Sequence, residues 1–220
     1  MGKEKLNHTR AFIYVGGYAD PSLLPRPAGD ELIIAADSGY LLAQRCGVTP
    51  HILLGDMDSI ADGEGFDAAK IPDGVLVVKV PAEKNETDTA LGVDTALDAG
   101  CREIYILGGL GGRFDHSLAN LFLLGYISER GGEGVLTDGR NRVRYLESGK
   151  MRVERSDFRY FSLISTGGSE GVSITGAKYP LSDAAITPGR QYAVSNEIAQ
   201  GSDCAEVGVT HGPLYIIESR

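Results

Sequence analysis

Acidic side chains follow several short apolar runs in the first half of the chain. Asp56 and Asp58 come after the run His51–Leu54, and Asp37 follows the run Leu32–Ala36. Side chains two residues apart on an extended backbone point the same way, so Asp56 and Asp58 can share a hard cation such as Mg²⁺. Gly-Asp and Asp-Ser pairs also form ordinary turns. Taken alone, these residues leave both the metal site and the plain turn open.

A second polar segment, Lys84-Asn-Glu-Thr-Asp88, opens a predicted helix. Either Thr87 or Asp88 can simply be the N-cap of that helix. Alternatively, Asp88 completes the metal site and Lys84 contacts phosphate, because the free N–H groups of a helix N-terminus favour a bound anion. Neighbouring residues can fill both roles, so the segment by itself decides nothing.

A third segment, Gly108-Gly-Leu-Gly-Gly-Arg-Phe-Asp-His116, connects a predicted strand to an amphipathic helix. Its four glycines let the backbone approach a phosphate closely, and Arg113 offers a planar fork to phosphate oxygens. The pattern is neither a Walker A loop nor a dinucleotide fingerprint. A flexible loop with Asp115 as N-cap is the alternative, but so many glycines cost stability, which favours a binding function. His116 can be a base or ligand, although first-turn histidines more often make structural hydrogen bonds.

The elements that must position these residues alternate along the chain up to about residue 140. Runs rich in Ile, Val and Leu predict strands buried on both faces. These runs are Ala11–Val15, Leu32–Ala36, His51–Leu54, Val75–Val80 and Ile104–Leu107, and the predicted helices are Gly39–Arg45, Asp88–Asp98 and Asp115–Ser128. This alternation predicts an α/β fold with a doubly wound, mostly parallel sheet, whose strand carboxyl ends form a ligand crevice.

The second half of the chain has a different pattern, with short alternating segments separated by Gly, Ser, Asp and Pro. The predicted strands are Val143–Leu146, Tyr160–Ile164, Val172–Ile174, Tyr192–Val194, Val207–Val209 and Leu214–Ile217. Their spacing of about ten residues is typical of a small all-β sandwich. We therefore expect an α/β domain over residues 1–140 and a β-sandwich domain over residues 141–220.

Composition narrows the range of partners. The formal net charge is −9, which makes nucleic acid and anionic membranes poor partners. An anionic nucleotide can still bind where a metal and local cations offset the repulsion. The cysteines Cys46, Cys101 and Cys204 form no C-x-x-C pair, which argues against zinc and favours reduced thiols. The first apolar run is too short for a signal or a membrane span, so we expect a cytoplasmic protein.

In this order, the three polar segments resemble the thiamine pyrophosphokinase family. The family pattern is Gly-Asp-Phe-Asp-Ser, then Lys-Asp-x-Thr-Asp, then Gly-Gly-x-Gly-Gly-Arg-x-Asp-His followed by Leu-Ala-Asn. The matching residues here are 55–59, 84–88, 108–116 and 118–120, and the thiamine-side motifs of the family are similar to residues 176–181 and 195–197. Each motif alone is weak, but five in register are specific.

The resemblance implies an enzyme that moves diphosphate from ATP to the thiamine hydroxyl and releases AMP. In-line attack of the hydroxyl on the β-phosphorus depends mainly on positioning and charge neutralisation. The implied catalytic residues are Asp56, Asp58, Asp88, Arg113 and Asp115, of which the three aspartates 56, 58 and 88 also hold Mg²⁺. Either Asp88 or Asp115 can accept the hydroxyl proton, and the sequence does not choose between them.

The two substrates are expected at different parts of the chain. The ATP-binding residues are expected to be Asp37, Lys84, Thr87, Gly109, Gly111, Gly112, Arg113 and His116, and the thiamine-binding residues Tyr179, Ser195 and Asn196. The resemblance also implies a homodimer with thiamine near the subunit interface. Tyr179 stands where some members of the family carry Trp, and its ring can stack on the cationic thiazolium. The alternative for Tyr179 is an ordinary place in the β-domain core.

Two further departures from the family pattern are Met57 in place of Phe and Asn85 in place of Asp. The first is a packing change, and the second removes a carboxylate. Two other functions stay open: a related enzyme that phosphorylates a different alcohol, and a non-catalytic nucleotide or thiamine sensor. Product analysis, AMP against ADP, separates the two enzymes. Intact carboxylates and Arg113 argue against the sensor, which can lose its metal ligands.

Overall fold

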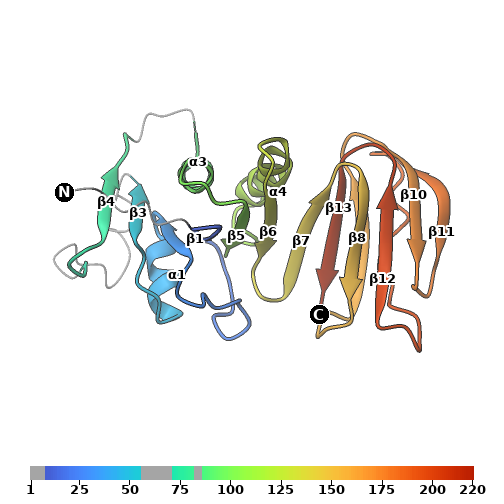
Figure 1. The fold of residues 1–220 in the computed structure, drawn as a ribbon, viewed down its shortest axis with the longest axis horizontal. Helices are drawn as coiled ribbons and strands as arrows, with labels where there is room; N and C mark the ends of the chain where they lie inside the picture. Colours follow the sequence, from blue (N-terminus) through green and yellow to red (C-terminus); the bar gives the residue numbers. More distant parts are fainter. Residues whose placement is uncertain (1–7, 56–70, 82–85) are drawn as a thin grey trace. The chain divides into compact units, whose positions relative to one another are not determined.

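A computed structural model describes residues 8–55, 71–81 and 86–220 (Figure 1). The chain divides into two compact units, Met1–Gly139 and Arg140–Arg220. The first is an α/β unit and the second an all-β unit. No helix in these described ranges is long and apolar enough to cross a membrane.

The α/β unit is built on a parallel sheet with the strand order β4-β3-β2-β1-β5-β6. Its strands are β1 (Arg10–Tyr14), β2 (Leu32–Ala36), β3 (Ile52–Gly55), β4 (Leu76–Lys79), β5 (Glu103–Leu107) and β6 (Glu133–Thr137). The chain adds β2, β3 and β4 on one side of β1 and then returns to add β5 and β6 on the other. The strand order therefore reverses between β1 and β5, as in doubly wound folds.

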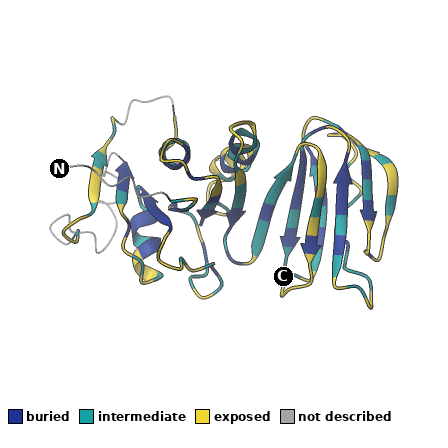
Figure 2. Cartoon of the chain, in the orientation of Figure 1, coloured by how far each residue is buried: buried dark blue, intermediate teal, exposed yellow. Residues whose placement is uncertain are grey.

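Helices cover both faces of this sheet: α1 (Gly39–Arg45), α3 (Asp88–Asp98) and α4 (Phe114–Glu129). Leu42 of α1 belongs to a buried cluster with Phe12 of β1, whereas Gly92 of α3 lies against Ile13 of the same strand. Successive strand residues point to opposite faces, so α1 and α3 lie on opposite sides of the sheet. The buried strand residues between them form the core of the unit (Figure 2).

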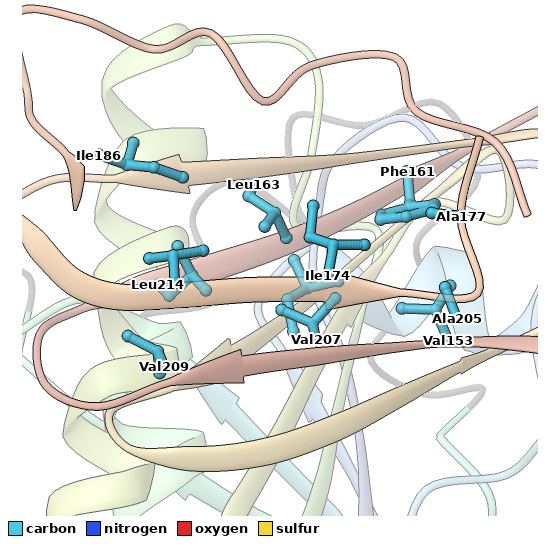
Figure 3. Packing of buried hydrophobic residues seen from close by; sticks show 12 residues of the cluster. Val153, Phe161, Leu163, Ile174, Ala177, Ile186, Ala205, Val207, Val209 and Leu214 are labelled. Atoms are coloured by element: carbon cyan, nitrogen blue, oxygen red, sulfur yellow. The ribbon is translucent and has the colours of Figure 1, made fainter. Parts of the chain in front are cut away.

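The all-β unit is a sandwich of two antiparallel sheets. One has the order β7-β13-β9 and the other β11-β10-β12-β8. The strands are β7 (Asn141–Leu146), β8 (Gly149–Glu154), β9 (Tyr160–Ser165), β10 (Ser169–Thr175), β11 (Leu181–Ile186), β12 (Cys204–Val209) and β13 (Leu214–Ser219). Phe161 and Leu163 of the first sheet share one core with Ile174 and Val207 of the second (Figure 3). The predicted fold class, a doubly wound sheet followed by an all-β sandwich, is confirmed.

For most elements, the observed bounds lie within two or three residues of the predicted bounds. Four elements do not agree. The predicted strand Tyr192–Val194 is wrong. This segment runs beside β9 but contributes one backbone hydrogen bond there, from Leu163 N–H to Ala193 O (2.7 Å), and Ser195 then turns the chain with a φ of 55°. Three strands were missed, β6, β8 and β11. Their sequences carry Gly, Lys, Arg, Ser or Asp, and pairing with neighbouring strands overrides the weak local preference.

Candidate functional site

A cleft of about 520 Å³ opens at the carboxyl ends of β1, β2 and β5, beside the reversal of strand order. Residues after the three strands and the first turns of α3 and α4 surround it. The lining residues are Val15, Gly16, Gly17, Ala36, Asp37, Ser38, Glu86, Thr87, Asp88, Thr89, Gly108, Gly109, Gly111, Gly112, Arg113, His116 and Asn120. Seven of the predicted ATP-binding residues therefore line one cleft, while the eighth, Lys84, lies outside the described residues.

Close backbone approach shapes the floor of the cleft. A Cβ atom added to Gly17 would lie 1.9 Å from the carbonyl oxygen of Gly108, and one added to Gly39 would lie 2.0 Å from that of Tyr14. Side chains at these positions would push the strand ends apart, so the cleft requires glycine there. The Gly108–Gly112 loop was predicted as a ligand site. Gly16 and Gly17 were missed, although a glycine pair directly after a buried strand is a signal for such a turn.

The N-terminus of α3 forms one wall. Thr87 is its N-cap, with Oγ1 accepting the N–H of Ala90 at 3.1 Å. Asp88 is half-buried in the first turn of the helix and lines the cleft. Thr87 thus caps the helix and lines the cleft at once. Its neighbours Glu86 and Thr89 line the cleft too, although neither was predicted from the sequence.

Arg113 and Asp115 form an ion pair at the start of α4. Arg113 Nη2 lies 2.6 Å and Nε 3.2 Å from the two carboxylate oxygens of Asp115, and both side chains are exposed. The hydrogen bond from Arg113 lowers the pKa of the Asp115 carboxyl. Asp115 does not cap the helix: the N-cap is Arg113, without a side-chain capping bond, so that alternative is wrong. Arg113 and His116 line the cleft, whereas Asp115 does not.

Two further side chains of α4 hold the glycine loop. Asn120 is 7% exposed, and its Nδ2 donates to the carbonyl oxygen of Gly109 at 2.9 Å. The hydroxyl of Ser117 accepts the N–H of Gly111 at 3.1 Å. These bonds fix the loop against the helix. Asn120 was not predicted as a site residue, although the Leu118-Ala-Asn120 motif that contains it could have indicated one.

The predicted metal site extends beyond the described part of the chain. Asp56 and Asp58 lie outside the described residues, as do Met57 and Asn85. Among the residues that are described, no three His, Cys, Asp or Glu side chains gather closely enough to hold a metal. Asp37, at a positive φ of 51°, and Asp88 both line the cleft.

The predicted thiamine-side residues meet in the all-β unit. Asn196 is 4% exposed, with Oδ1 accepting the N–H of Tyr179 (3.0 Å) and Nδ2 donating to the carbonyl oxygen of Tyr179 (2.8 Å). The Tyr179 side chain is 58% exposed, so its place in the β-domain core is excluded. Ser195 is exposed, and its N–H donates to Ser162 Oγ at 3.0 Å. Lys178 Nζ lies 5.5 Å from the centre of the Tyr179 ring and 2.9 Å from Glu197 Oε1.

Comparisons with known proteins match the chain in both units. Residues 28–133 match the model of the thiamin pyrophosphokinase catalytic domain, and residues 150–214 that of the thiamin pyrophosphokinase vitamin B1 binding domain. Thiamine pyrophosphokinase of Bacillus subtilis (strain 168) is 33% identical over 183 residues, which span 80% of this chain and 85% of that protein.

Solved structures agree with these matches. The crystal structure of thiamine pyrophosphokinase from Bacillus subtilis superposes with a TM-score of 0.83 at 29% identity, covering 96% of this chain and 98% of that one. The structure of thiamin pyrophosphokinase from Geobacillus thermodenitrificans gives a TM-score of 0.79 at 28% identity, covering 96% of this chain and 97% of that one. The chain belongs to the thiamin pyrophosphokinase family.

Proposed function

We propose that this chain transfers diphosphate from ATP to the hydroxyl of thiamine, giving thiamine diphosphate and AMP. The observation that carries the proposal is the cleft where a glycine loop and the N-termini of two helices converge. N–H groups at helix N-termini and in glycine loops favour phosphate oxygens. Family membership supplies the acceptor alcohol, and residues 1–140 and 141–220 are proposed as the nucleotide-binding catalytic and the thiamine-binding domains.

The triphosphate is proposed to lie along the Gly108–Gly112 loop, between α3 and α4. Arg113 is well placed for this role because Asp115 holds its guanidinium at the entrance to α4. Asp37, Thr87 and His116 lie around the same cleft, and Lys84 is proposed as a further phosphate ligand. Residues that hold the triphosphate in one position also orient its β-phosphorus for attack.

Mg²⁺ is proposed to bind Asp56, Asp58 and Asp88. Acidic residues line the cleft, namely Asp37, Glu86 and Asp88, and carboxylate oxygens are the ligands that a hard cation prefers. When bound, the ion would neutralise negative charge on the phosphates. Of the two carboxylates considered as proton acceptor, Asp88 lines the cleft, whereas Asp115 lies outside the lining and is paired with Arg113. This supports Asp88 as the acceptor.

Thiamine is proposed to contact the face of the all-β unit that carries Tyr179, Ser195 and Asn196. An exposed aromatic ring suits the thiazolium, because the face of an aromatic ring attracts a cation. The neighbouring Lys178 lies over this ring but is paired with Glu197, which offsets its charge. Glu197 also lies 3.7 Å from Arg159, so its carboxylate is shared between two cations.

We further propose a cytoplasmic homodimer. Phe114, Leu118 and Phe122 are exposed at positions i, i+4 and i+8 of α4, and they form one apolar stripe. An exposed stripe of this kind is typical of a protein interface, and a second copy of the chain is the proposed partner. Sedimentation velocity is expected to give a dimer, and Phe122→Glu is expected to shift the protein toward monomer.

The test of activity is incubation with ATP, Mg²⁺ and thiamine, followed by chromatography. Thiamine diphosphate and AMP are expected in equal amounts, without ADP or thiamine monophosphate. Stoichiometric ADP would contradict diphosphate transfer, and no thiamine product at all would favour another alcohol or the sensor.

A further inference from the structure

On the proposed thiamine face, Asn196 differs from Tyr179 and Ser195 in that its side chain is buried and bonded to backbone groups. Tyr179 and Ser195 expose their side chains, whereas Asn196 is 4% exposed. A side-chain amide has one oxygen with two lone pairs and one nitrogen with two N–H groups. The oxygen of Asn196 accepts from the N–H of Tyr179 (3.0 Å) and from the N–H of Glu197 (2.9 Å), so both lone pairs are occupied.

The nitrogen of the same amide completes a two-way link to the backbone of one residue, Tyr179. Asn196 Nδ2 donates to the carbonyl oxygen of Tyr179 at 2.8 Å while Oδ1 accepts from the N–H of that residue. Both backbone groups of Tyr179 are therefore bound by a single side chain. A pair of bonds of this kind fixes the orientation as well as the position of the residue that carries it.

The backbone of Asn196 is anchored in turn to the sandwich. The N–H of Asn196 donates to the carbonyl oxygen of Phe161 (2.8 Å), and the N–H of Phe161 donates to the carbonyl oxygen of Asn196 (2.9 Å). Phe161 is a buried core residue of β9. Asn196 thus connects the rigid core of the unit to the peptide of an exposed tyrosine.

The geometry points to Asn196 as a positioning residue that orients Tyr179 toward thiamine and does not itself touch the substrate. This inference rests on the proposed function. It assigns the substrate contacts of this face to the Tyr179 ring and the exposed Ser195, while Asn196 acts through Tyr179. The direction in which the Tyr179 side chain leaves the backbone is then fixed before the substrate arrives, which favours binding.

A double-mutant cycle separates positioning from direct contact. Thiamine affinity is measured by calorimetry on the wild type, Asn196→Ala, Tyr179→Ala and the double variant. Each single change is expected to weaken thiamine binding by about 2- to 30-fold, the range for loss of a stacked aromatic ring. In the Tyr179→Ala background the second change is expected to cost less than about twofold, because residues that act through one another are not additive. Additive losses would overturn the inference, since they indicate an independent contact by Asn196.

A spectroscopic readout tests the same link without any substrate. The chain contains no tryptophan, so Tyr179→Trp places a single fluorophore at this position. Adding Asn196→Ala is expected to lower the fluorescence anisotropy of Trp at position 179, while the KM for ATP stays unchanged. Unchanged anisotropy would overturn the inference. Where Asn196→Ala does not fold, Asn196→Asp replaces it in both experiments, because it keeps the acceptor for the two N–H groups and turns the donor into a charged oxygen that repels the Tyr179 carbonyl.

Ser169→Ala is the matched control for a purely structural effect. Ser169 is a buried hydrogen-bonding residue of the same unit, with Oγ 2.8 Å from Ser165 Oγ and 3.1 Å from Pro213 O. It is expected to lower the melting temperature and leave thiamine affinity unchanged. An Asn196→Ala protein that behaves like this control would show Asn196 to be a folding residue only. Failure of the wild type to bind thiamine would instead refute the proposed function, and the anisotropy comparison would still decide whether Asn196 orients residue 179.

Discussion

The cleft of the α/β unit and the proposed thiamine face of the all-β unit are built in different ways. Backbone forms the cleft: Gly17 approaches Gly108 so closely that no side chain fits between them, and two helices begin at its rim. Side-chain hydrogen bonds form the thiamine face, where Asn196 binds the peptide of Tyr179 across 17 positions of sequence. The cleft therefore depends on glycines at fixed positions, whereas the thiamine face depends on the buried side-chain amide of Asn196.

This difference predicts different responses to substitution. Changes in the cleft act on the reacting phosphates and on the strand ends that carry them. Changes on the thiamine face act on one substrate and leave nucleotide binding alone.

Asp88→Asn is expected to give the largest loss. It keeps the shape of the side chain and removes a charge from the cleft, and losing one such electrostatic group costs on the order of 10²–10³ in rate. The same loss is expected for Asp56→Asn and Asp58→Asn. Steady-state kinetics at saturating Mg²⁺ measure it. Asp98→Asn, in the last turn of α3, is the control and should leave turnover near normal. Near-normal turnover of Asp88→Asn would remove this carboxylate from the chemistry.

Gly17→Ala is expected to distort the cleft and lower stability together. Forcing an extra atom against packed backbone costs about 1–3 kcal/mol, which corresponds to a fall in melting temperature of roughly 2–12 °C for a chain of this size. Thermal denaturation and the KM for ATP check both effects. Gly189→Ala is the control, because a Cβ there meets nothing within 4 Å and no positive φ is required. An unchanged KM for ATP in Gly17→Ala would mean that backbone approach does not define the cleft.

The same contrast explains how much the sequence predicted. The doubly wound sheet, the helices Gly39–Arg45 and Asp88–Asp98, and the glycine loop follow from local patterns, and all were found. Strand β8, with the sequence Gly-Lys-Met-Arg-Val-Glu, has no apolar run and becomes a strand only by pairing with β12. The amide bonds of Asn196 to Tyr179 depend on tertiary structure, so the sequence placed both residues on the thiamine side without indicating that one holds the other.

Tyr179→Ala tests the thiamine face and is expected to have an intermediate effect. Loss of the ring should raise the KM for thiamine by about 2- to 30-fold, because a cation over an aromatic face contributes roughly 0.5–2 kcal/mol. The KM for ATP should barely change. Tyr179→Phe keeps the ring and should differ from the wild type by less than about twofold. Because the side chain is exposed, the melting temperature should change little. A large fall in melting temperature with an unchanged thiamine KM would contradict the stacking role.

Glu197→Gln is expected to have the smallest effect of the four, although it breaks the most visible ion pair on this face. The hydrogen bond from Lys178 lowers the pKa of the Glu197 carboxyl, so at neutral pH the carboxylate is charged and bound to Lys178 at 2.9 Å. Yet the loop does not depend on this pair, because backbone bonds link the same segments, from Lys178 N–H to Glu197 O (2.8 Å) and from Ala199 N–H to Gly176 O (3.0 Å). Exposed ion pairs add little to such a scaffold, so the KM for thiamine should change by less than about threefold. Lys178→Gln, which removes one of the two cationic partners of Glu197 and leaves Arg159, is the matched variant and should behave alike. A tenfold rise in the thiamine KM with Glu197→Gln alone would show that the carboxylate attracts the thiazolium directly, and the thiamine face would then depend on charge as the cleft does.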